Sequence, residues 1–589
     1  MSTRRRSRGT TRRTFLRAVP STLAAAGAAR HVPAAANQAA ANQAAPSQPD
    51  AISTATLRHG EQLAGLTFTE SEEESMLGLV RSNRDFFEAL RRVPVPADTE
   101  PVFGFHVPIP ASARRANTAR GNEAMPPAKP RSPARSVEVR APIETLAFKS
   151  VTVLAEIIRS RQVTSTALTN MYLERLKTHG RRLEAVITLT EDLALAQAAA
   201  ADREIAAGRY RGPLHGIPWG VKDLFATHGI RTTWGAKPYE HQMIDTDATA
   251  VARLREAGAV LLAKLSTGEL AQGNVWFGGR TLNPWGPARS SGGSSAGPGA
   301  ATAGGLVAFS IGTATGGSIV QPASACGLVG LQPTYGRVSR YGAMTLAWTL
   351  DRVGPICRSV EDCMLVLAAI AGPDGHDETV TDVPMPWNPE APVGALRIGY
   401  VPSLFDQAPE GRGPAATQAA RHAVLKTALQ AFGRIGRLQA VELPDFPVLA
   451  LFTIVLAEGG ASFDELVRSG AAAQLAGQAP GARASGLRAT RFVPAVEYIR
   501  AQRIRTLLIR EMNRLFANVD VIVTPADLGI VRMTSLTGHP CITLKSGFVD
   551  GYPEAILVTG SFFNEGVMAR VALAYEQATE WKDRHPTMT

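Results

Sequence analysis

The stretch GGSSAGPGAATAGGLVAFSIGTATGGS, residues 292–318, is the part of this chain that most restricts its fold. Of its 27 residues, 19 are Gly, Ala or Ser. Small residues cannot fill a core, but they let one backbone segment turn tightly and approach another closely. The middle of the stretch, GGLVAFSIGT, is apolar and typical of a strand. We therefore expect the stretch to lie inside the fold, with serines near both of its ends.

Two kinds of functional loop fit a run of Gly and Ser. A phosphate-binding loop places Lys directly after its glycines, and neither Gly293 nor Gly317 is followed by Lys. A serine nucleophile site fits better, because GSSAG, residues 293–297, matches G-x-S-x-G with Ser295 at its centre. An esterase of the α/β-hydrolase type would also need a downstream His, and several His residues follow. That alternative stays open at this point.

Composition and charge indicate a large folded protein that does not bind nucleic acid. The chain has 589 residues, 45% of them hydrophobic, which is enough for a large core. The formal net charge is +11. The excess positive charge lies in residues 1–36, which hold eight Arg and no acidic residue, and in residues 109–141. The folded part therefore carries no basic face of the kind that binds nucleic acid.

Cysteine usage predicts no metal centre. The four Cys residues form no CxxC motif and no Cys/His cluster with the spacing of metal ligands. We expect neither a structural zinc nor a disulfide framework, and interpret the four residues as buried free thiols.

The N-terminus resembles a twin-arginine export signal. TRRTFLR, residues 11–17, contains the pair Arg12–Arg13 and precedes the short apolar run AVPSTLAAAGAA. We therefore expect residues 1–36 to be a signal peptide and the protein to be periplasmic or extracellular. The run is too short to span a membrane, and no other stretch reaches about 18 uninterrupted apolar residues, so no stable membrane insertion is expected.

The rest of the chain divides into an extension and a catalytic domain. We expect residues 37–142 to form the extension, with 37–58 extended or disordered, one helix over 68–93 and then a Pro/Arg-rich linker. In residues 143–589 the pattern alternates between strands and helices, which predicts an α/β fold around one mixed or mostly parallel sheet. The expected strands lie within 216–223, 259–265, 306–313 and 520–527, and the expected helices within 151–162, 166–179, 247–258, 417–433 and 450–515.

Several motifs that occur together and in order carry a family resemblance. They are GIPWGVKD, GAVLLAKLSTGELA, NPWGPARSSGGSSAGP, GTATGGSIVQPASACGLVGLQPTYGRVSRYG, LDRVGP and LTGHP. The chain resembles the amidase signature family over roughly residues 143–576. The resemblance implies a central, mixed, twisted β-sheet with helices on both faces.

The resemblance also implies a Ser–cis-Ser–Lys arrangement. Lys222 of GVKD matches the catalytic lysine of the family, and Ser318 of TGGS matches the nucleophile. Ser294 matches the serine that follows a cis peptide bond, and its separation of 24 residues from Ser318 is the spacing of the family. Under this interpretation Ser295 is a bystander.

Physical chemistry is consistent with these roles. A serine hydroxyl is a poor nucleophile until a base takes its proton, and a lysine can be that base only when burial keeps it neutral. Whether Asp223 would instead hold Lys222 in its charged form is left open by the sequence. Ser294 would relay the proton between Lys222 and Ser318. The backbone N–H groups of the TGGS loop, Thr315, Gly316, Gly317 and Ser318, would stabilise the tetrahedral oxyanion.

The chain departs from the family pattern beside the nucleophile. Many members read GTDTGGSIR where this chain reads GTATGGSIV, so an acid and a base are replaced together by Ala314 and Val320. The change predicts a less charged pocket and puts in doubt any contact of that arginine with a substrate carboxylate. Trp276 and Phe277, which precede the serine loop, are candidates for lining the acyl pocket, and core packing would explain them equally well.

We therefore expect an amidase that hydrolyses a carboxylic amide C–N bond through an acyl-Ser318 intermediate. The expected partner is a small-molecule amide, with no metal or cofactor, and a homo-oligomer is compatible with the sequence. Three alternatives remain: an amidotransferase-like subunit that passes ammonia to a tRNA-bound partner, an esterase that uses Ser295, and a non-catalytic binding protein on the same scaffold.

Overall fold

A computed structural model describes residues 52–102, 104, 142–406 and 414–588. The predicted export signal, the first part of the extension and most of the Pro/Arg-rich linker lie outside these residues. The division of the chain into signal, extension and catalytic domain therefore stays a prediction.

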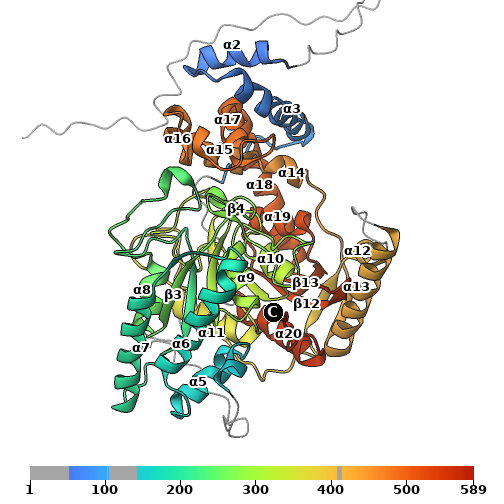
Figure 1. The fold of residues 1–589 in the computed structure, drawn as a ribbon. Helices are drawn as coiled ribbons and strands as arrows, with labels where there is room; N and C mark the ends of the chain where they lie inside the picture. The colour runs from blue at the N-terminus through green and yellow to red at the C-terminus, as the bar shows by residue number, and fades with distance from the viewer. Residues whose placement is uncertain (1–51, 103, 105–141, 407–413, 589) are drawn as a thin grey trace, which may run out of the picture. The chain divides into compact units, whose positions relative to one another are not determined.

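One large sheet organises the described residues (Figure 1). Its 11 strands, in spatial order, are β1 (Val186–Leu189), β3 (Val260–Leu265), β2 (Pro218–Lys222), β6 (Phe309–Ala314), β8 (Arg352–Cys357), β7 (Val329–Gln332), β12 (Cys541–Val549), β13 (Tyr552–Gly560), β11 (Val521–Pro525), β9 (Arg397–Tyr400) and β10 (Arg437–Ala440). Strands β3, β2 and β6 run parallel, the pairs from β6 through β8, β7, β12 and β13 to β11 are antiparallel, and β11, β9 and β10 are parallel again. The predicted mixed sheet is confirmed.

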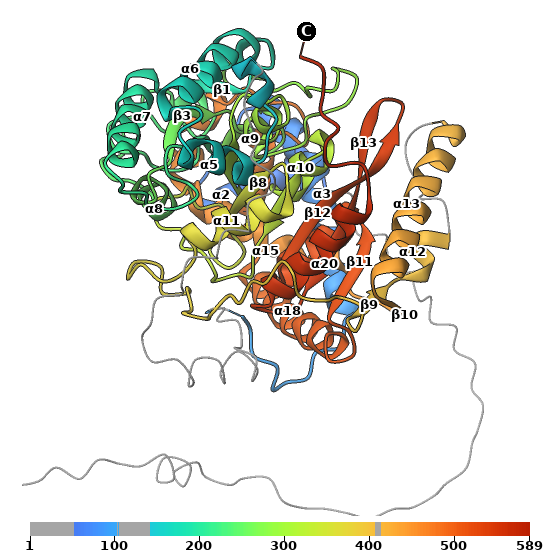
Figure 2. The same cartoon turned by 90° about the horizontal axis from the view of Figure 1, so that it is seen from below.

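Helices cover both faces of this sheet. Every residue of β2, β3, β6 and β8 is buried, which an open sheet allows only when both of its faces are covered. Figures 1 and 2 show helices along the length of the sheet. They include α5 (Val151–Arg159), α6 (Ser165–Arg175), α7 (Glu191–Ala206), α8 (Thr249–Glu256), α9 (Ala296–Ala303), α10 (Val320–Cys326), α11 (Val360–Ile370), α12 (Pro402–Asp406), α13 (Ala415–Ile435) and α20 (Glu565–Ala578).

The predicted elements agree with the structure in most places. Strands β2, β3, β6 and β11 and helices α5, α6, α8 and α13 lie in the expected segments or extend beyond them by at most two residues at either end. The four Cys residues are free and buried, as expected. The region 450–515 is helical, and together with its flanks it contains α14 (Val448–Leu451), α15 (Thr453–Ser462), α16 (Asp464–Arg468), α17 (Arg483–Ala489) and α18 (Ala495–Leu515); α19 (Leu528–Thr537) follows β11.

One expectation for the extension is wrong. Residues 37–58 are expected to be extended or disordered, but helix α2 (Thr54–Ala64) begins inside that range. Ser53 and Thr56 form a reciprocal capping box at its start. Leu57 is buried, and this apolar contact explains why the helix extends into a segment of otherwise polar, low-complexity sequence.

Helix α3 (Glu70–Arg92) fastens the extension to the helical region near the end of the chain. Thr69 and Glu72 form the capping box at its start. The helix packs against α14, α17 and α18, as Figure 1 shows. Glu72 is ion-paired with Arg488, and Arg91 lies 2.7 Å from Glu497. Two segments about 400 residues apart in the sequence therefore form one packed layer.

A buried ion pair joins the centre of the chain to its last helix. Arg337 and Glu565 are both buried, and their charged groups lie 2.9 Å apart. Glu565 also accepts the backbone N–H of Thr334 (2.9 Å). Burial opposes ionisation of the carboxyl group, but the charge and hydrogen bond of Arg337 outweigh burial and lower the pKa of Glu565. The native state therefore stabilises the ionised carboxylate.

Replacing Glu565 with Gln is expected to destabilise the protein by about 3–5 kcal/mol, because the Arg337 charge would remain buried without its counterion. The lowered pKa also means that the wild-type contribution is fully present above the pKa of an unfolded Glu, about 4.3, and is lost as the pH falls through the lower folded value. Thermal and urea unfolding of both proteins between pH 3 and 7 measure this difference.

Glu156→Gln is the matched control, because Glu156 and Arg159 form an exposed pair one helical turn apart. Its cost should stay below about 0.5 kcal/mol. Equal costs for the two variants would contradict the role given to the buried pair.

Candidate active site

Two adjacent parallel strands bring the predicted catalytic segments together. Lys222 is the last residue of β2, and β6 lies beside β2, with Val221 opposite Ile311. The TGGS loop directly follows β6. Because the carboxyl ends of parallel strands meet at one edge of a sheet, Lys222 and this loop lie next to each other.

Lys222 is fully buried and lies within hydrogen-bond distance of two hydroxyl groups. Its Nζ lies 2.7 Å from Ser294 Oγ and 2.9 Å from Thr313 Oγ1. Thr313 is a residue of this site that no sequence motif singles out. Its position near the carboxyl end of β6, beside the strand that carries Lys222, is the signal that would have found it.

The structure settles how Asp223 relates to Lys222. Successive residues of a strand point to opposite faces of the sheet. Asp223 accordingly turns away from Lys222 and lies 2.9 Å from Nζ of Lys264, with both groups fully buried. It also accepts the backbone N–H and the hydroxyl of Thr233, at 2.8 and 2.5 Å. Asp223 therefore neutralises a different lysine.

The environment of Lys222 favours a neutral amine. Burial lowers its pKa well below that of an ordinary lysine, and Asp351 is the one charge that opposes the shift among the described residues. A neutral amine can accept a proton from Ser294. The structure thus gives Lys222 the property that a general base requires.

Ser294 lies in a loop built on close backbone contacts. The peptide bond between Gly293 and Ser294 is cis, the conformation that the family resemblance implies. A Cβ atom on Gly293 would lie 2.0 Å from the carbonyl oxygen of Gly273, so only Gly fits this position. The carbonyl of Ser294 accepts the N–H of Gly268 (3.0 Å), and this bond fixes the loop against the segment after β3.

The TGGS loop presents free backbone donors beside this pair. Gly317 has a φ of 115°, a conformation that side chains rarely adopt. Within the described residues, no group accepts the N–H of Gly316, Gly317 or Ser318. Ser318 is partly exposed, whereas Lys222 and Ser294 are buried. The Ser318 carbonyl also accepts the N–H of Ser295 (3.3 Å), which joins the two ends of the small-residue stretch.

Asp351, from the LDRVGP motif, anchors the loop from behind. Its buried carboxylate accepts the hydroxyl of Thr315 and the backbone N–H groups of Leu346 (2.7 Å) and Ala347 (3.0 Å). Burial raises the pKa of Asp351 to about 6, against these hydrogen bonds. The motif is visible in the sequence, but the contact of Asp351 with Thr315 is not.

Ser295 has the surroundings of a structural residue. It is fully buried, and its hydroxyl donates to the carbonyl of Thr313 (3.2 Å). In the part of the chain that the structure describes, no His contacts it: His539, for example, is buried between Phe516 and Phe562. The geometry gives no support to an esterase that uses Ser295 with a His base.

The side chains nearest the TGGS loop are not those expected from the sequence. A Cβ on Gly316 would lie 2.7 Å from the Phe452 ring, and one on Gly317 would lie 2.5 Å from Val531. Trp276 and Phe277 lie on the short hairpin of β4 (Val275–Trp276) and β5 (Gly279–Arg280), with their rings packed edge to face. Their contact with substrate stays a prediction.

The departures at Ala314 and Val320 are accommodated by apolar packing. Both side chains are buried. Val320 packs in one cluster with Val531 and Leu557, and Ala314 packs in another with Ile319. A lone acid or base at either position would lack a partner there, which explains why the two charges are absent together.

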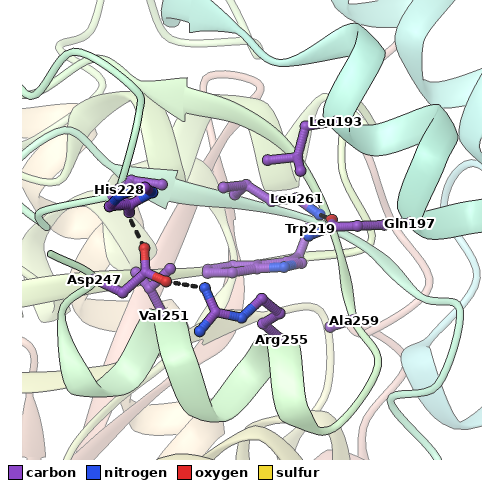
Figure 3. Close-up of a pocket in the computed structure, with 10 residues that line it drawn as sticks. Leu193, Gln197, Trp219, His228, Asp247, Val251, Arg255, Ala259 and Leu261 are labelled. Carbon is purple, nitrogen blue, oxygen red and sulfur yellow. Dashed lines mark hydrogen bonds and ion pairs between the residues drawn. The ribbon is translucent and has the colours of Figure 1, made fainter. Parts of the chain in front are cut away.

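A cavity of about 180 Å³ lies apart from these residues. Figure 3 shows side chains of α7, α8 and the neighbouring strands around the ring of Trp219. Trp219 precedes Lys222 by three residues on β2, so the two side chains point to opposite faces of the sheet. The cavity is therefore separate from the predicted catalytic residues.

The described residues contain no group of three or more His, Cys, Asp or Glu side chains arranged to hold a metal ion. A search of the helices in the same residues finds none that is long and apolar enough to cross a membrane.

Comparison with known proteins adds to this geometry. The family model described as Amidase matches residues 167–531. A glutamyl-tRNA(Gln) amidotransferase subunit of Roseiflexus sp. (strain RS-1) is 36% identical over 74% of this chain and 97% of its own length. The native peptide amidase of Stenotrophomonas maltophilia is 31% identical, with a TM-score of 0.65 over 74% of this chain and 97% of that one. The corresponding amidotransferase subunit of Thermotoga maritima is 25% identical, with a TM-score of 0.58 over 72% and 94%. The fold, the ordered motifs and these matches together show that the chain belongs to the amidase signature family.

Proposed function

We propose that this protein hydrolyses a carboxylic amide C–N bond, with Ser318 as nucleophile, Ser294 as proton relay and Lys222 as general base. The observation that carries the proposal is the buried amine of Lys222, 2.7 Å from Ser294, beside a loop with unpaired backbone donors. Among the described residues, no carboxylate contacts that amine, so no ion pair holds it in the protonated form. The arrangement suits the activation of a hydroxyl group.

In the first half of the proposed reaction, Ser318 Oγ attacks the amide carbonyl carbon. Its proton passes to Ser294 Oγ, and the proton of Ser294 passes to Nζ of Lys222. The carbonyl oxygen becomes an oxyanion that accepts the N–H groups of the TGGS loop. When the tetrahedral intermediate collapses, the C–N bond breaks, Ser294 protonates the leaving amine, and Lys222 returns a proton to Ser294.

In the second half, water attacks the acyl-Ser318 ester through the same relay. The ester C–O bond breaks, the carboxylic acid leaves and Ser318 regains its proton. The chemistry uses side chains and backbone alone. Asp351 supports it at a distance, because its bond to Thr315 holds the strand end from which the oxyanion loop starts.

The proposal includes export, with a periplasmic or extracellular site of action, on the basis of the TRRTFLR sequence at residues 11–17. A hydrolase that acts alone on a small-molecule amide suits such a location, whereas tRNA is cytoplasmic.

A second candidate is an amidotransferase component, which would release ammonia from an amide and pass it to a partner protein. The observation in its favour is the name that curated relatives carry, at 36% identity over 97% of the first one's length. Both candidates share the acyl-serine chemistry. They differ in where the ammonia goes and in whether the chain needs a second protein for activity.

Ser318→Ala and Lys222→Ala are each expected to lower kcat/KM for amide hydrolysis by at least about 10³-fold, because nucleophile and base act as a unit. Ser294→Ala should also be strongly impaired, since the proton path would be interrupted. Release of ammonia from a panel of primary amides by the purified full chain measures these effects.

Ser295→Ala is the control, because Ser295 is buried and bonded to the Thr313 carbonyl. It should keep most of the activity. If instead Ser295→Ala is inactive and Ser318→Ala is active, the nucleophile has been assigned to the wrong end of the stretch.

The pH dependence of kcat/KM should rise with pH as Lys222 loses its proton, and should reach its plateau well below the ordinary lysine pKa of about 10.4. The reason is that burial lowers the pKa of Lys222. Asp351→Asn removes the opposing charge, so the rise should move to still lower pH while the maximal rate falls. A pH–rate series from pH 5 to 11 on both proteins tests the assignment, and a rise centred near 10.4 would contradict a buried neutral base.

The hydrolase proposal predicts that the purified chain alone turns over a neutral amide such as hexanamide and labels at Ser318 with a fluorophosphonate. An amidotransferase component would instead copurify with a second protein and release ammonia efficiently only in that complex. Ammonia release with and without copurifying proteins distinguishes the two.

A further inference from the structure

The side chains that border the TGGS loop come from the late part of the chain. Phe452, between α14 and α15, lies against Gly316, and Val531 of α19 lies against Gly317. The next residue on α19 is Arg532. The carbon of its guanidinium group lies 5.2 Å from the centre of the Phe452 ring, so the group stacks on the side chain that borders the oxyanion loop.

Arg532 differs from the deeply buried arginines in its surroundings. Arg337, Arg352 and Arg505 each donate hydrogen bonds to carbonyl or carboxylate oxygens. Within the described residues, Arg532 donates to no oxygen and forms no ion pair; its guanidinium contacts the ring of Phe452. Arg532 is half-buried, and burial lowers its pKa. A cation that has lost water without gaining an acceptor is costly unless a ligand supplies the acceptor.

Asp527 is the carboxylate that acts on Arg532 through its charge. It is committed elsewhere, because it caps α19 by accepting the N–H of Gly529 (2.6 Å). The contact with Phe452 places the guanidinium carbon over a ring, and a ring is not an oxygen acceptor for the N–H groups of Arg532. Those N–H groups thus stay available for two parallel bonds to a carboxylate.

We propose that Arg532 binds a carboxylate of the substrate, so that the preferred substrate is an amide that also carries a carboxylate group. This inference rests on the proposed function of the same site. A carboxylate-binding Arg532 is also compatible with the apolar packing of Val320. If the cation that binds the carboxylate lies beside Phe452, the site needs no second cation at position 320. Lys222 and Asp351 are both buried, whereas Arg532 is partly exposed and borders the TGGS loop through Phe452, so among these three described residues Arg532 is the charge open to a substrate.

A matched substrate pair tests the proposal. Adipic acid monoamide and hexanamide have the same number of carbon atoms, and only the first has a terminal carboxylate. The wild-type chain should favour the monoamide in kcat/KM by about tenfold or more, as expected for a charge-assisted pair. The monoamides of succinic and glutaric acid then measure how far Arg532 reaches.

Arg532→Gln should abolish this preference, with the loss for the monoamide at least about tenfold larger than the loss for hexanamide. Arg532→Lys should restore part of the preference, because it keeps the charge without the planar pair of donors. Arg584→Gln is the control: Arg584 also stacks on an aromatic ring, that of Phe548 (4.3 Å). Phe548 lies near the far end of β12, roughly 20 Å along the strand from Cys541, which packs with Val531.

Binding to the Ser318→Ala chain separates this inference from the proposed function. Calorimetry should detect the monoamide more tightly than hexanamide, and adding Arg532→Gln should remove the difference. If the wild-type chain hydrolyses nothing but this Arg532-dependent binding is present, the inference stands and the hydrolase proposal fails. If hexanamide and the monoamide are turned over equally, or if Arg532→Gln leaves their ratio unchanged, Arg532 is not the carboxylate site.

Discussion

The site depends on burying the amine of Lys222 one residue away from the buried carboxylate of Asp223. Lys222 and Asp223 are adjacent, yet strand geometry points them to opposite faces of the sheet. On one face Lys264 and Thr233 compensate Asp223. On the other face Lys222 meets hydroxyl groups, and no carboxylate of the described residues lies at contact distance. The burial of β2 therefore matters for chemistry as well as for packing. Water beside Lys222 would stabilise its protonated form and would oppose the lowering of its pKa by burial.

The loops around the lysine follow from small residues. Gly273 and Gly293 come so close that a side chain on Gly293 would overlap the opposite carbonyl, and Gly317 holds a conformation that favours Gly. Such loops have little apolar surface to hold them in place. Hydrogen bonds do this instead: Asp351 fixes the start of the TGGS loop, and the Ser294 carbonyl fixes the serine loop. The glycines allow the two loops to adopt these backbone conformations, and the buried hydrogen bonds select one conformation for each loop.

The sequence predicted the sheet, its mixed character and most elements around the catalytic segments, because apolar strands such as AVLLAKL and ordered motifs are local signals. It missed β12 and β13 near the middle of the sheet: β12 is interrupted by Lys, Ser and Gly, and the apolar run of β13 is only four residues long. It also missed Thr313, Phe452 and Arg532, whose places at the site come from strand pairing and from the packing of α14 and α19. Those contacts join residues far apart in the chain, and no local pattern encodes them. Helix α2 was missed for the opposite reason, since its caps and Leu57 are local but stand in low-complexity sequence.

The order of strands in the sheet differs from the order in which the ribosome makes them. Strands β12 and β13 come from the last tenth of the chain, yet they lie between β7 and β11 and join the two halves of the sheet. Until they emerge, β7 and β11 each present an unpaired edge, and Glu565 is not yet available to Arg337. The sheet is therefore completed only when translation is nearly finished, and a nascent chain stalled before residue 541 would expose two unpaired strand edges that invite pairing with other chains.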